Sequence, residues 1–240
     1  MDPHNPVVEL CTRGMRAEAE GRDDDARALF RQAWDRAADD YEACIAAHYL
    51  ARHQPTPEET LHWNQECLDR ADLVGDDRVT GFYASLHLNM AKAYADLDRP
   101  EKAHAHYESA AAHIGAVPPG PYGDGIRMAT AEGLRATGRT TRARSAVDDT
   151  LADLFRSLCA RGDLKALGLI LPAYLTDLGT DEDRTRLVTA LHMVHAGRWL
   201  PDADQDTLAA ALGGLTALGE QTAAGRNSAP DGADTSGATG

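Results

Sequence analysis

Apolar residues recur along most of the chain at the spacing of one helix face, and glycine or proline separates the successive apolar stretches. Ala, Leu, Arg, Asp and Glu dominate the composition, whereas Ile and Phe are scarce, and this balance favours helix over sheet. The pattern therefore predicts an all-α protein. We expect helices over residues 6–20, 23–38, 40–53, 57–73, 79–97, 100–114, 124–137, 140–161 and 181–199, and a last helix from residue 202.

Residues 84–117 carry the clearest pattern, with small residues at three positions and aromatic residues at two. The small residues are Ala91, Ala103 and Ala110, and the aromatic residues are Tyr94 and Tyr107. Small side chains let two helices approach closely, and an aromatic ring fills the space beside them. Pro100 suits the first turn of the second helix. The stretch therefore predicts a helix–turn–helix unit.

The same spacing recurs in two other segments of the chain. In residues 7–40, Gly14 stands at the first small position and Phe30 at the second aromatic position. Residues 124–157 align in the same way, with Ala131 at the first small position. A unit of this kind cannot bury its apolar face alone, so the recurrence predicts that successive units stack on one another.

A degenerate copy lies between the first two, with a longer turn around Pro55 and Pro57. A 34-residue helix–turn–helix with this pattern is typical of the tetratricopeptide repeat, and residues 7–157 resemble a bacterial tetratricopeptide-repeat protein. The resemblance implies a superhelix of helix–turn–helix units with C-terminal capping helices. It also implies a scaffold that holds a peptide or a helix in a concave groove.

The pattern divides the chain into four segments. Residues 1–117 contain three repeats, the second degenerate, and residues 118–161 contain a hinge rich in proline and glycine, followed by the fourth repeat. Residues 162–224 are expected to form a C-terminal helical bundle or cap, in which Pro172 predicts a kink or two short helices. Residues 225–240 lack large apolar side chains and are expected to form a disordered tail.

The chain is strongly acidic, with 38 Asp and Glu against 24 Lys and Arg and a net charge of −14. Such a charge repels phosphate groups, so we expect no nucleic acid as the main partner. No apolar stretch reaches the roughly 18 residues that a membrane span needs, and the N-terminus lacks the basic start of a secretion signal. We therefore expect no membrane association.

The four cysteines contain no Cys-x-x-Cys pair, so we expect no structural zinc site. Cys11 and Cys44 fall at equivalent positions of adjacent predicted helices. Packed helices lie about 8–10 Å apart, which is too far for easy disulfide formation. The cysteines are therefore expected to be reduced thiols in a cytoplasmic protein.

The resemblance also identifies residues that are expected to line the groove. They are Met15, Tyr41, Cys44, His48, Arg52, Asn89, Lys92, Met128 and Arg135. Arg and Lys in such a groove can hold a carboxylate or an acidic segment. Cys11 and Met15 stand where the chaperone-binding subclass has Lys and Asn, and this departure argues against binding of a chaperone C-terminus.

We expect a non-catalytic scaffold for a protein or peptide partner, with no cofactor and no metal, and the sequence leaves a homo-oligomer open. Two alternatives remain. One is a ligand-responsive regulator, in which the groove or the hinge senses a peptide or small molecule. The other is a small enzyme, because His48, His53 and His62 cluster around the long turn, where nearby carboxylates would make an acid–base pair. His192 and His195, three residues apart on one helix, suggest a metal site but have no obvious third ligand.

Overall fold

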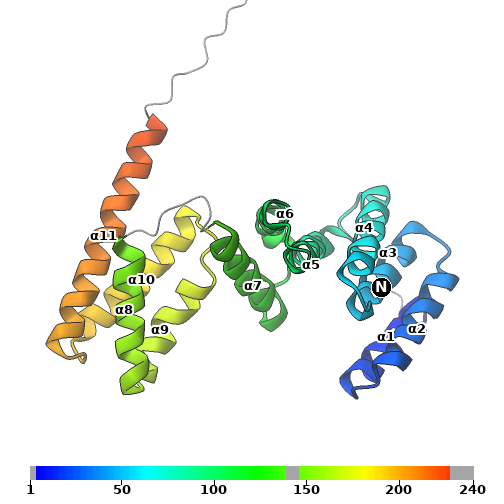
Figure 1. The fold of residues 1–240 in the computed structure, drawn as a ribbon, viewed down its shortest axis with the longest axis horizontal. Helices are drawn as coiled ribbons and strands as arrows, with labels where there is room; N and C mark the ends of the chain where they lie inside the picture. Colours follow the sequence, from blue (N-terminus) through cyan, green and yellow to red (C-terminus); the bar gives the residue numbers. More distant parts are fainter. Residues whose placement is uncertain (1–3, 139–145, 228–240) are drawn as a thin grey trace, which may run out of the picture. The chain divides into compact units, whose positions relative to one another are not determined.

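A computed structural model describes residues 4–138 and 146–227, with side chains as far as residue 217 (Figure 1). Over these ranges the chain forms α-helices, short 3₁₀ helices and turns, and no strand. The prediction of an all-α protein is confirmed. Within the same ranges, no helix combines the length and the apolar character that crossing a bilayer requires.

The chain divides into two compact units, residues 1–142 and residues 143–240. The first unit contains α1 (Pro6–Ala19), α2 (Asp23–Arg36), α3 (Asp40–Leu50), α4 (Pro57–Val74), α5 (Tyr83–Asp96), α6 (Pro100–His113) and α7 (Pro121–Gly138), with the 3₁₀ helices η1 (Ala51–His53), η2 (Thr80–Phe82) and η3 (Ile114–Ala116). The second unit contains α8 (Ala146–Arg161), α9 (Leu164–Leu175), α10 (Asp181–Gly197) and α11 (Asp202–Asn227). Residues 124–157, predicted as one repeat, thus contribute α7 to the first unit and α8 to the second.

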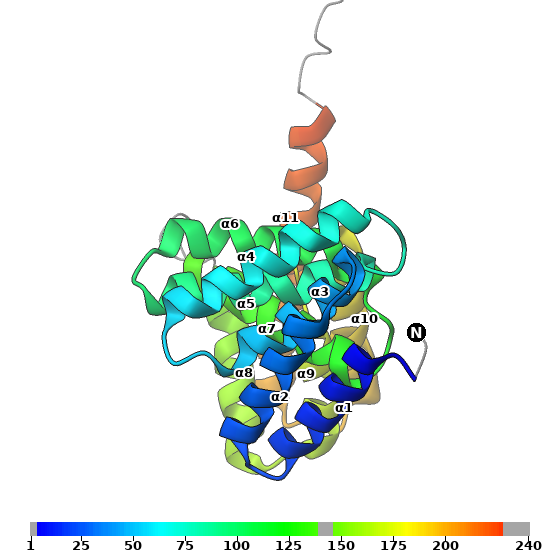
Figure 2. The ribbon, with the colours of Figure 1, turned by 90° about the vertical axis from the view of Figure 1, so that its right-hand side faces the viewer.

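In the first unit each helix packs on the next one along the chain, and α7 packs on both α5 and α6 (Figure 2). Two turns in this unit share one backbone geometry. Gly21 and Asp98, seven residues after Gly14 and Ala91 respectively, both have positive φ, at 71° and 54°. The residue after each donates its N–H to a carbonyl five positions earlier, at 2.9 Å in both cases. The pairs α1–α2 and α5–α6 are therefore joined by equivalent turns.

The α8–α9 turn in the second unit has the same geometry. Gly162 has φ of 64°, and the N–H of Asp163 donates to the Leu158 carbonyl, again five positions earlier, at 3.0 Å. Glycine suits this turn because a positive φ strains residues that carry a Cβ. Residues 146–175 therefore form a helix hairpin of the same kind, in a register that the sequence pattern did not predict.

The small and aromatic positions pack as the pattern indicated. A Cβ at Gly14 would lie 2.3 Å from Cε1 of Phe30, whose side chain is fully buried between α1 and its neighbours. Tyr107 fills an equivalent space against α7, where a Cβ at Gly133 would lie 2.1 Å from the Tyr107 ring. Gly133 was not predicted as a packing residue. Each glycine thus lets its helix approach an aromatic ring.

Three apolar clusters form the interior. The first joins α1 to α4 and reaches Leu86 at the start of α5, with Phe30 and Leu50 also among its fully buried residues. The second joins α5, α6 and α7 around Tyr107. The third lies within the second unit and joins α8 to α11. Both units therefore have cores of their own.

Several predicted boundaries differ from the structure. The third predicted helix ends at Leu50 and continues as η1, the fifth begins at Tyr83 after η2, and the seventh begins at Pro121. The final helix extends to Asn227, so the first residues of the predicted tail are helical, and residues 228–240 lie outside the described ranges. Residues 140–145 of the eighth predicted helix lie outside them as well.

Pro172 does not divide its segment into two helices, because α9 runs through it as a single element. Proline removes the hydrogen bond to the carbonyl four residues earlier, that of Gly168. Gly168 is exposed, so water can satisfy that carbonyl, and only one further turn of helix follows Pro172. The expectation of two short helices is wrong for this reason, and the alternative of a kink at Pro172 stays a prediction.

Candidate functional site

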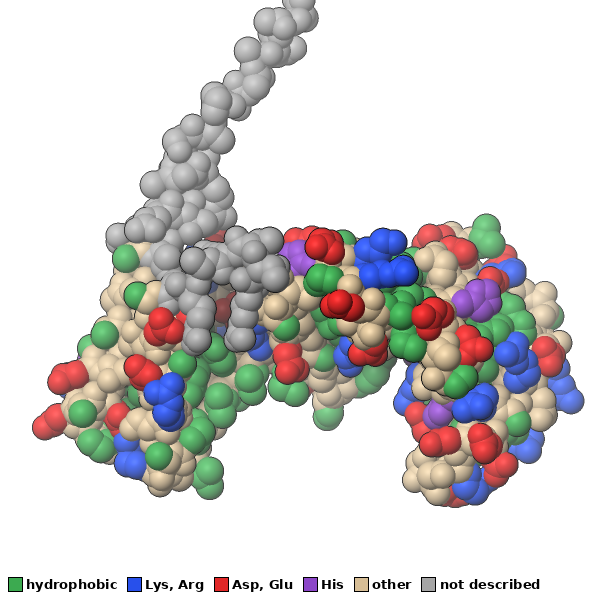
Figure 3. Space-filling model, viewed as in Figure 1, with side chains coloured by type: hydrophobic (Ala, Val, Ile, Leu, Met, Phe, Trp, Pro, Cys, Tyr) green, Lys and Arg blue, Asp and Glu red, His purple; other side chains and the backbone are tan. Residues whose placement is uncertain are grey.

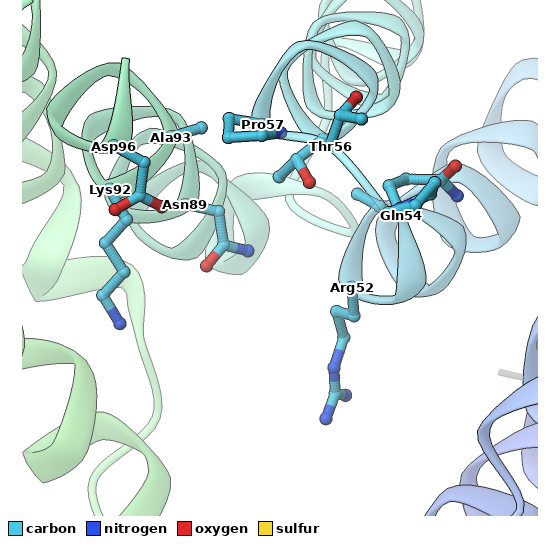
Figure 4. A pocket seen from close by; sticks show the side chains of 11 residues that line it. Arg52, Gln54, Thr56, Pro57, Asn89, Lys92, Ala93 and Asp96 are labelled. Atoms are coloured by element: carbon cyan, nitrogen blue, oxygen red, sulfur yellow. The ribbon is translucent and has the colours of Figure 1, made fainter. Parts of the chain in front are cut away.

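The first unit contains a pocket of about 550 Å³ between the start of α4 and the C-terminal half of α5 (Figure 4). One wall comes from Ala51, Arg52, residues 54–57 and Thr60, and the other from Asn89, Lys92, Ala93 and Asp96. A pocket of this size suits a small molecule or a few residues of a peptide.

The turn that forms one wall is held by its own hydrogen bonds. Thr56 caps α4, because its Oγ1 accepts the Glu59 N–H at 3.2 Å, and Pro57 occupies the first helical position. Gln54 donates its side-chain amide to the Leu50 carbonyl at 2.7 Å. These contacts and two fixed proline φ angles preorganise the wall.

Two cationic side chains flank the pocket, Arg52 from η1 and Lys92 from α5, and both extend toward its open side (Figure 4). Nη2 of Arg52 lies 2.5 Å from Oε1 of Glu18 on α1, and Nε2 of His53 lies 3.4 Å from the same oxygen. Among the described residues, the Lys92 ammonium has no ion-pair or hydrogen-bond partner. The pocket therefore offers one cation that is already paired and one that is free.

Asn89 and Asp96 complete the polar lining on α5. The Asn89 amide has no hydrogen-bond partner in the described part of the chain, so it can both donate to and accept from a ligand. The Asp96 carboxylate offsets one of the two positive charges and Glu18 the other, so a ligand carboxylate has to displace Glu18 from Arg52. The lining therefore suits a ligand that carries one carboxylate beside polar groups better than a polyanion.

The nearby surface has mixed charge. In Figure 3, acidic and basic side chains are interspersed over the face of the first unit that is in view. A nucleic-acid site needs a basic stripe or patch to hold successive phosphates. The visible face does not present one among its described residues.

The structure brings together three of the nine predicted groove residues, Arg52, Asn89 and Lys92. Four others lie outside this pocket. Met15 on α1 and Met128 on α7 are exposed, and Tyr41 on α3 and Arg135 on α7 are half-buried. The Arg78 guanidinium lies 4.6 Å from the centre of the Tyr41 ring.

Cys44 and His48 cannot line a groove, because both are buried in the first core cluster or against it. The residues from Ala43 to His48 are all buried, since α3 packs against α1, α2 and α4. The prediction gave α3 an exposed face because α3 is the first helix of its predicted repeat, and the first helices of such repeats line the groove. Surrounding helices cover that face instead.

The three histidines of the proposed acid–base cluster have different surroundings. The His48 ring packs against Tyr49 and Phe82, and burial lowers its pKa to about 4. His53 lies beside Glu18, whereas His62 is exposed and contacts the edge of Trp63. None of the three lines the pocket.

Comparisons with protein-family models, curated proteins and solved structures find no match to this chain. Within the described residues, no group of three or more His, Cys, Asp or Glu side chains could hold a metal ion.

The thiol that Cys44 contacts belongs to Cys67, a contact that the sequence analysis did not anticipate. Sγ of Cys44 lies 3.5 Å from Sγ of Cys67 on α4, and the Cys67 thiol donates to the Cys44 carbonyl at 3.1 Å. Burial raises the pKa of Cys67, and it raises the pKa of Cys11 to about 12. These groups remain protonated thiols at neutral pH, and a protonated thiol is a poor nucleophile.

Gln54, Thr56 and Asp96 line the pocket but were missed by the sequence reasoning. The signal for the first two was present in the longer turn, where a Thr between two prolines is typical of a rigid N-cap. No repeat pattern marks Asp96, which follows Lys92 by one helical turn and so shares its face.

Proposed function

We propose that the first unit is a non-catalytic interaction module that binds a peptide of a protein partner at the pocket between α4 and α5. Arg52, Asn89 and Lys92 are its polar contacts. The observation that carries the proposal is the meeting of two cations and a free amide in one pocket of a chain whose net charge is −14.

The chemistry of the lining supports a peptide that carries a carboxylate. Arg52 and Lys92 can donate charge-assisted hydrogen bonds to its two oxygens, and Asn89 can pair with a backbone amide group of the same peptide. The wall formed by residues 54–57 is already ordered, so little conformational entropy is lost on binding. Asp96 disfavours runs of acidic residues, which gives selectivity by repulsion.

The proposal includes an architecture of tetratricopeptide type for the first unit. The equivalent turns at Gly21 and Asp98 support it, as do the glycine–aromatic contact of Gly14 with Phe30 and the pairing of successive helices. We also propose a cytoplasmic location, supported by the buried thiols of Cys44 and Cys67, which lie in contact without a disulfide.

The test is selection of binders from a random-peptide library on the full chain. We expect enriched peptides to carry an acidic residue or a free C-terminal carboxylate, and to be lost with the Arg52→Glu, Lys92→Glu double variant. The matched control is Arg13→Glu with Arg36→Glu, which makes the same charge change at exposed positions outside the pocket. Enriched peptides that bind both double variants as well as the wild type would refute the proposal.

A further inference from the structure

A cluster of three histidines lies between α5 and α6. His87 comes from α5, and His106 and His113 come from α6. The Nδ1 atoms of His87 and His106 are 3.1 Å apart, and the ring centres of His87 and His113 are 5.7 Å apart. A helix turns about 100° per residue, so Lys92 and Asp96 lie about 140° and 180° around α5 from His87. The cluster is therefore on the side of α5 away from the pocket.

Aromatic side chains fix the rings of this cluster. Tyr94 stacks on His106, and Tyr83 stacks on His113, with ring centres 5.2 Å apart in both pairs. The Tyr83 hydroxyl in turn donates to the Asp72 carboxylate at 2.8 Å. The stacking holds the His106 ring with its Nδ1 atom toward His87, before any ligand is bound.

The separation of the two Nδ1 atoms fits two ligands of one metal ion. Imidazole nitrogens bind Zn²⁺ at about 2.0–2.1 Å, and two such ligands at a tetrahedral angle lie about 3.3 Å apart. The separation must therefore grow by only a few tenths of an ångström. Both rings must also tilt, so that their Nδ1 lone pairs meet at the ion instead of facing each other. Without metal, one Nδ1–H donates to the other Nδ1. On metal binding the donor ring changes tautomer, with its proton at Nε2, so that both Nδ1 lone pairs are available to the ion.

Burial favours the neutral, ligating form of both rings. Burial, together with His106 and His113, lowers the pKa of His87 to about 4, with Asp72 acting in the opposite direction. Burial and Lys102 lower the pKa of His106. A neutral imidazole has a free lone pair, so metal binding costs no free energy for removing a proton from an imidazolium ion.

We propose that His87 and His106 bind a late first-row divalent cation, Zn²⁺ above all, through their Nδ1 atoms. Water molecules complete the coordination, because the described residues supply no group of three protein ligands. The site joins α5 to α6, so bound metal stabilises the first unit by mass action. Because the protein supplies only two ligands, we expect the ion to bind with modest affinity.

The test is calorimetric titration of the full chain with ZnCl₂ at pH 7.5. We expect one site in the wild type and loss of it in His87→Ala and in His106→Ala. The matched control is His62→Ala, an exposed histidine on α4, which should bind as the wild type does. Zinc binding that is unchanged in both cluster variants would overturn the proposal.

A second measurement covers the case in which an alanine variant fails to fold. In the wild type, long-range ¹H–¹⁵N spectra should show Zn²⁺ shifting the Nδ1 signals of two histidines and leaving the others in place. Shifts confined to other histidines would contradict the assignment.

Discussion

At the scale of single residues, a missing Cβ sets the distance between two helices. The Phe30 ring occupies the space in which a side chain at Gly14 would stand, and the ring is fully buried. The sequence could predict this contact, because the two residues hold the small and aromatic positions of one repeat unit. It could not predict the contact of Gly133 with Tyr107, because these two residues belong to successive predicted repeats within the first unit.

Gly14→Ala should therefore destabilise the first unit by roughly 1–3 kcal/mol, because a buried aromatic ring must move to admit the new methyl group. Gly125→Ala is the control in the same unit. Its Cβ would meet nothing within 4 Å, so alanine should stabilise α7 by about 0.5–1 kcal/mol. Urea unfolding measures both changes, and an equal effect of the two substitutions would contradict the packing described here.

Glu18 holds the Arg52 guanidinium, and a ligand carboxylate must compete with it. Glu18→Gln should therefore tighten the binding of a carboxylate peptide by roughly two- to fivefold, the worth of an exposed ion pair. Fluorescence polarisation with a labelled peptide from the library measures the change. Glu20→Gln, which removes a charge from the same helix end outside the pocket, should leave the affinity unchanged.

The lowered pKa of His48 predicts how the free energy of unfolding depends on pH. Its pKa falls to about 4 in the folded protein, against about 6.5 in an unfolded chain, so the unfolded state binds more protons between these values. The contribution of neutral His48 to the free energy of unfolding is therefore fully present above pH 6.5. It is lost as the pH falls toward 4, by up to about 1.4 kcal/mol per pH unit for this one group. His48→Leu should reduce this dependence by the share of one group in urea unfolding, because His87 and His106 contribute in the same direction. The exposed His62→Leu should leave it unchanged.

At the scale of elements, the helices follow from apolar spacing, and their ends follow from capping residues. The spacing predicted α1, α2, α4 and α6 to within a few residues because each has one apolar face. It misjudged α3, whose residues are apolar on nearly every side and leave no exposed face for a groove. The pocket could not be predicted, because one wall depends on the backbone conformation of residues 54–57, and apolar periodicity does not determine that conformation.

The equivalent turns allow a comparison within one protein. Asp98 has φ of 54°, a conformation that costs less for glycine, so Asp98→Gly should stabilise the first unit by about 0.5–1 kcal/mol. Gly21→Ala introduces the same strain at the α1–α2 turn and should destabilise it by about 1–2 kcal/mol. Thermal unfolding of both variants measures the two effects, and effects of the same sign would show that the turns are not equivalent.

At the scale of the whole molecule, the chain consists of two units with separate cores. The sequence indicated a helical C-terminal region distinct from the clear repeats, but the division falls between α7 and α8, within the stretch predicted as the fourth repeat. In that stretch a Leu stands where the clear repeat has an aromatic residue, so the repeat pattern is weaker there. The pattern therefore could not show where the first unit ends.

Because each unit has its own core, residues 1–142 should fold without the rest of the chain. We expect cooperative thermal unfolding and a far-ultraviolet dichroism spectrum typical of helix for this fragment, and peptide binding equal to that of the full chain. A fragment that remains unfolded would contradict the independence of the first core. Residues 143–240, prepared in the same way, should fold but not bind the peptide.

The central claim is that Arg52, Asn89 and Lys92 form one peptide site. Its most direct test is an NMR titration of the full chain with a peptide selected from the library. We predict that the Arg52 Nε–H and Asn89 side-chain amide signals shift together and saturate at one peptide per chain. Signals that shift elsewhere while these two stay in place would contradict the account.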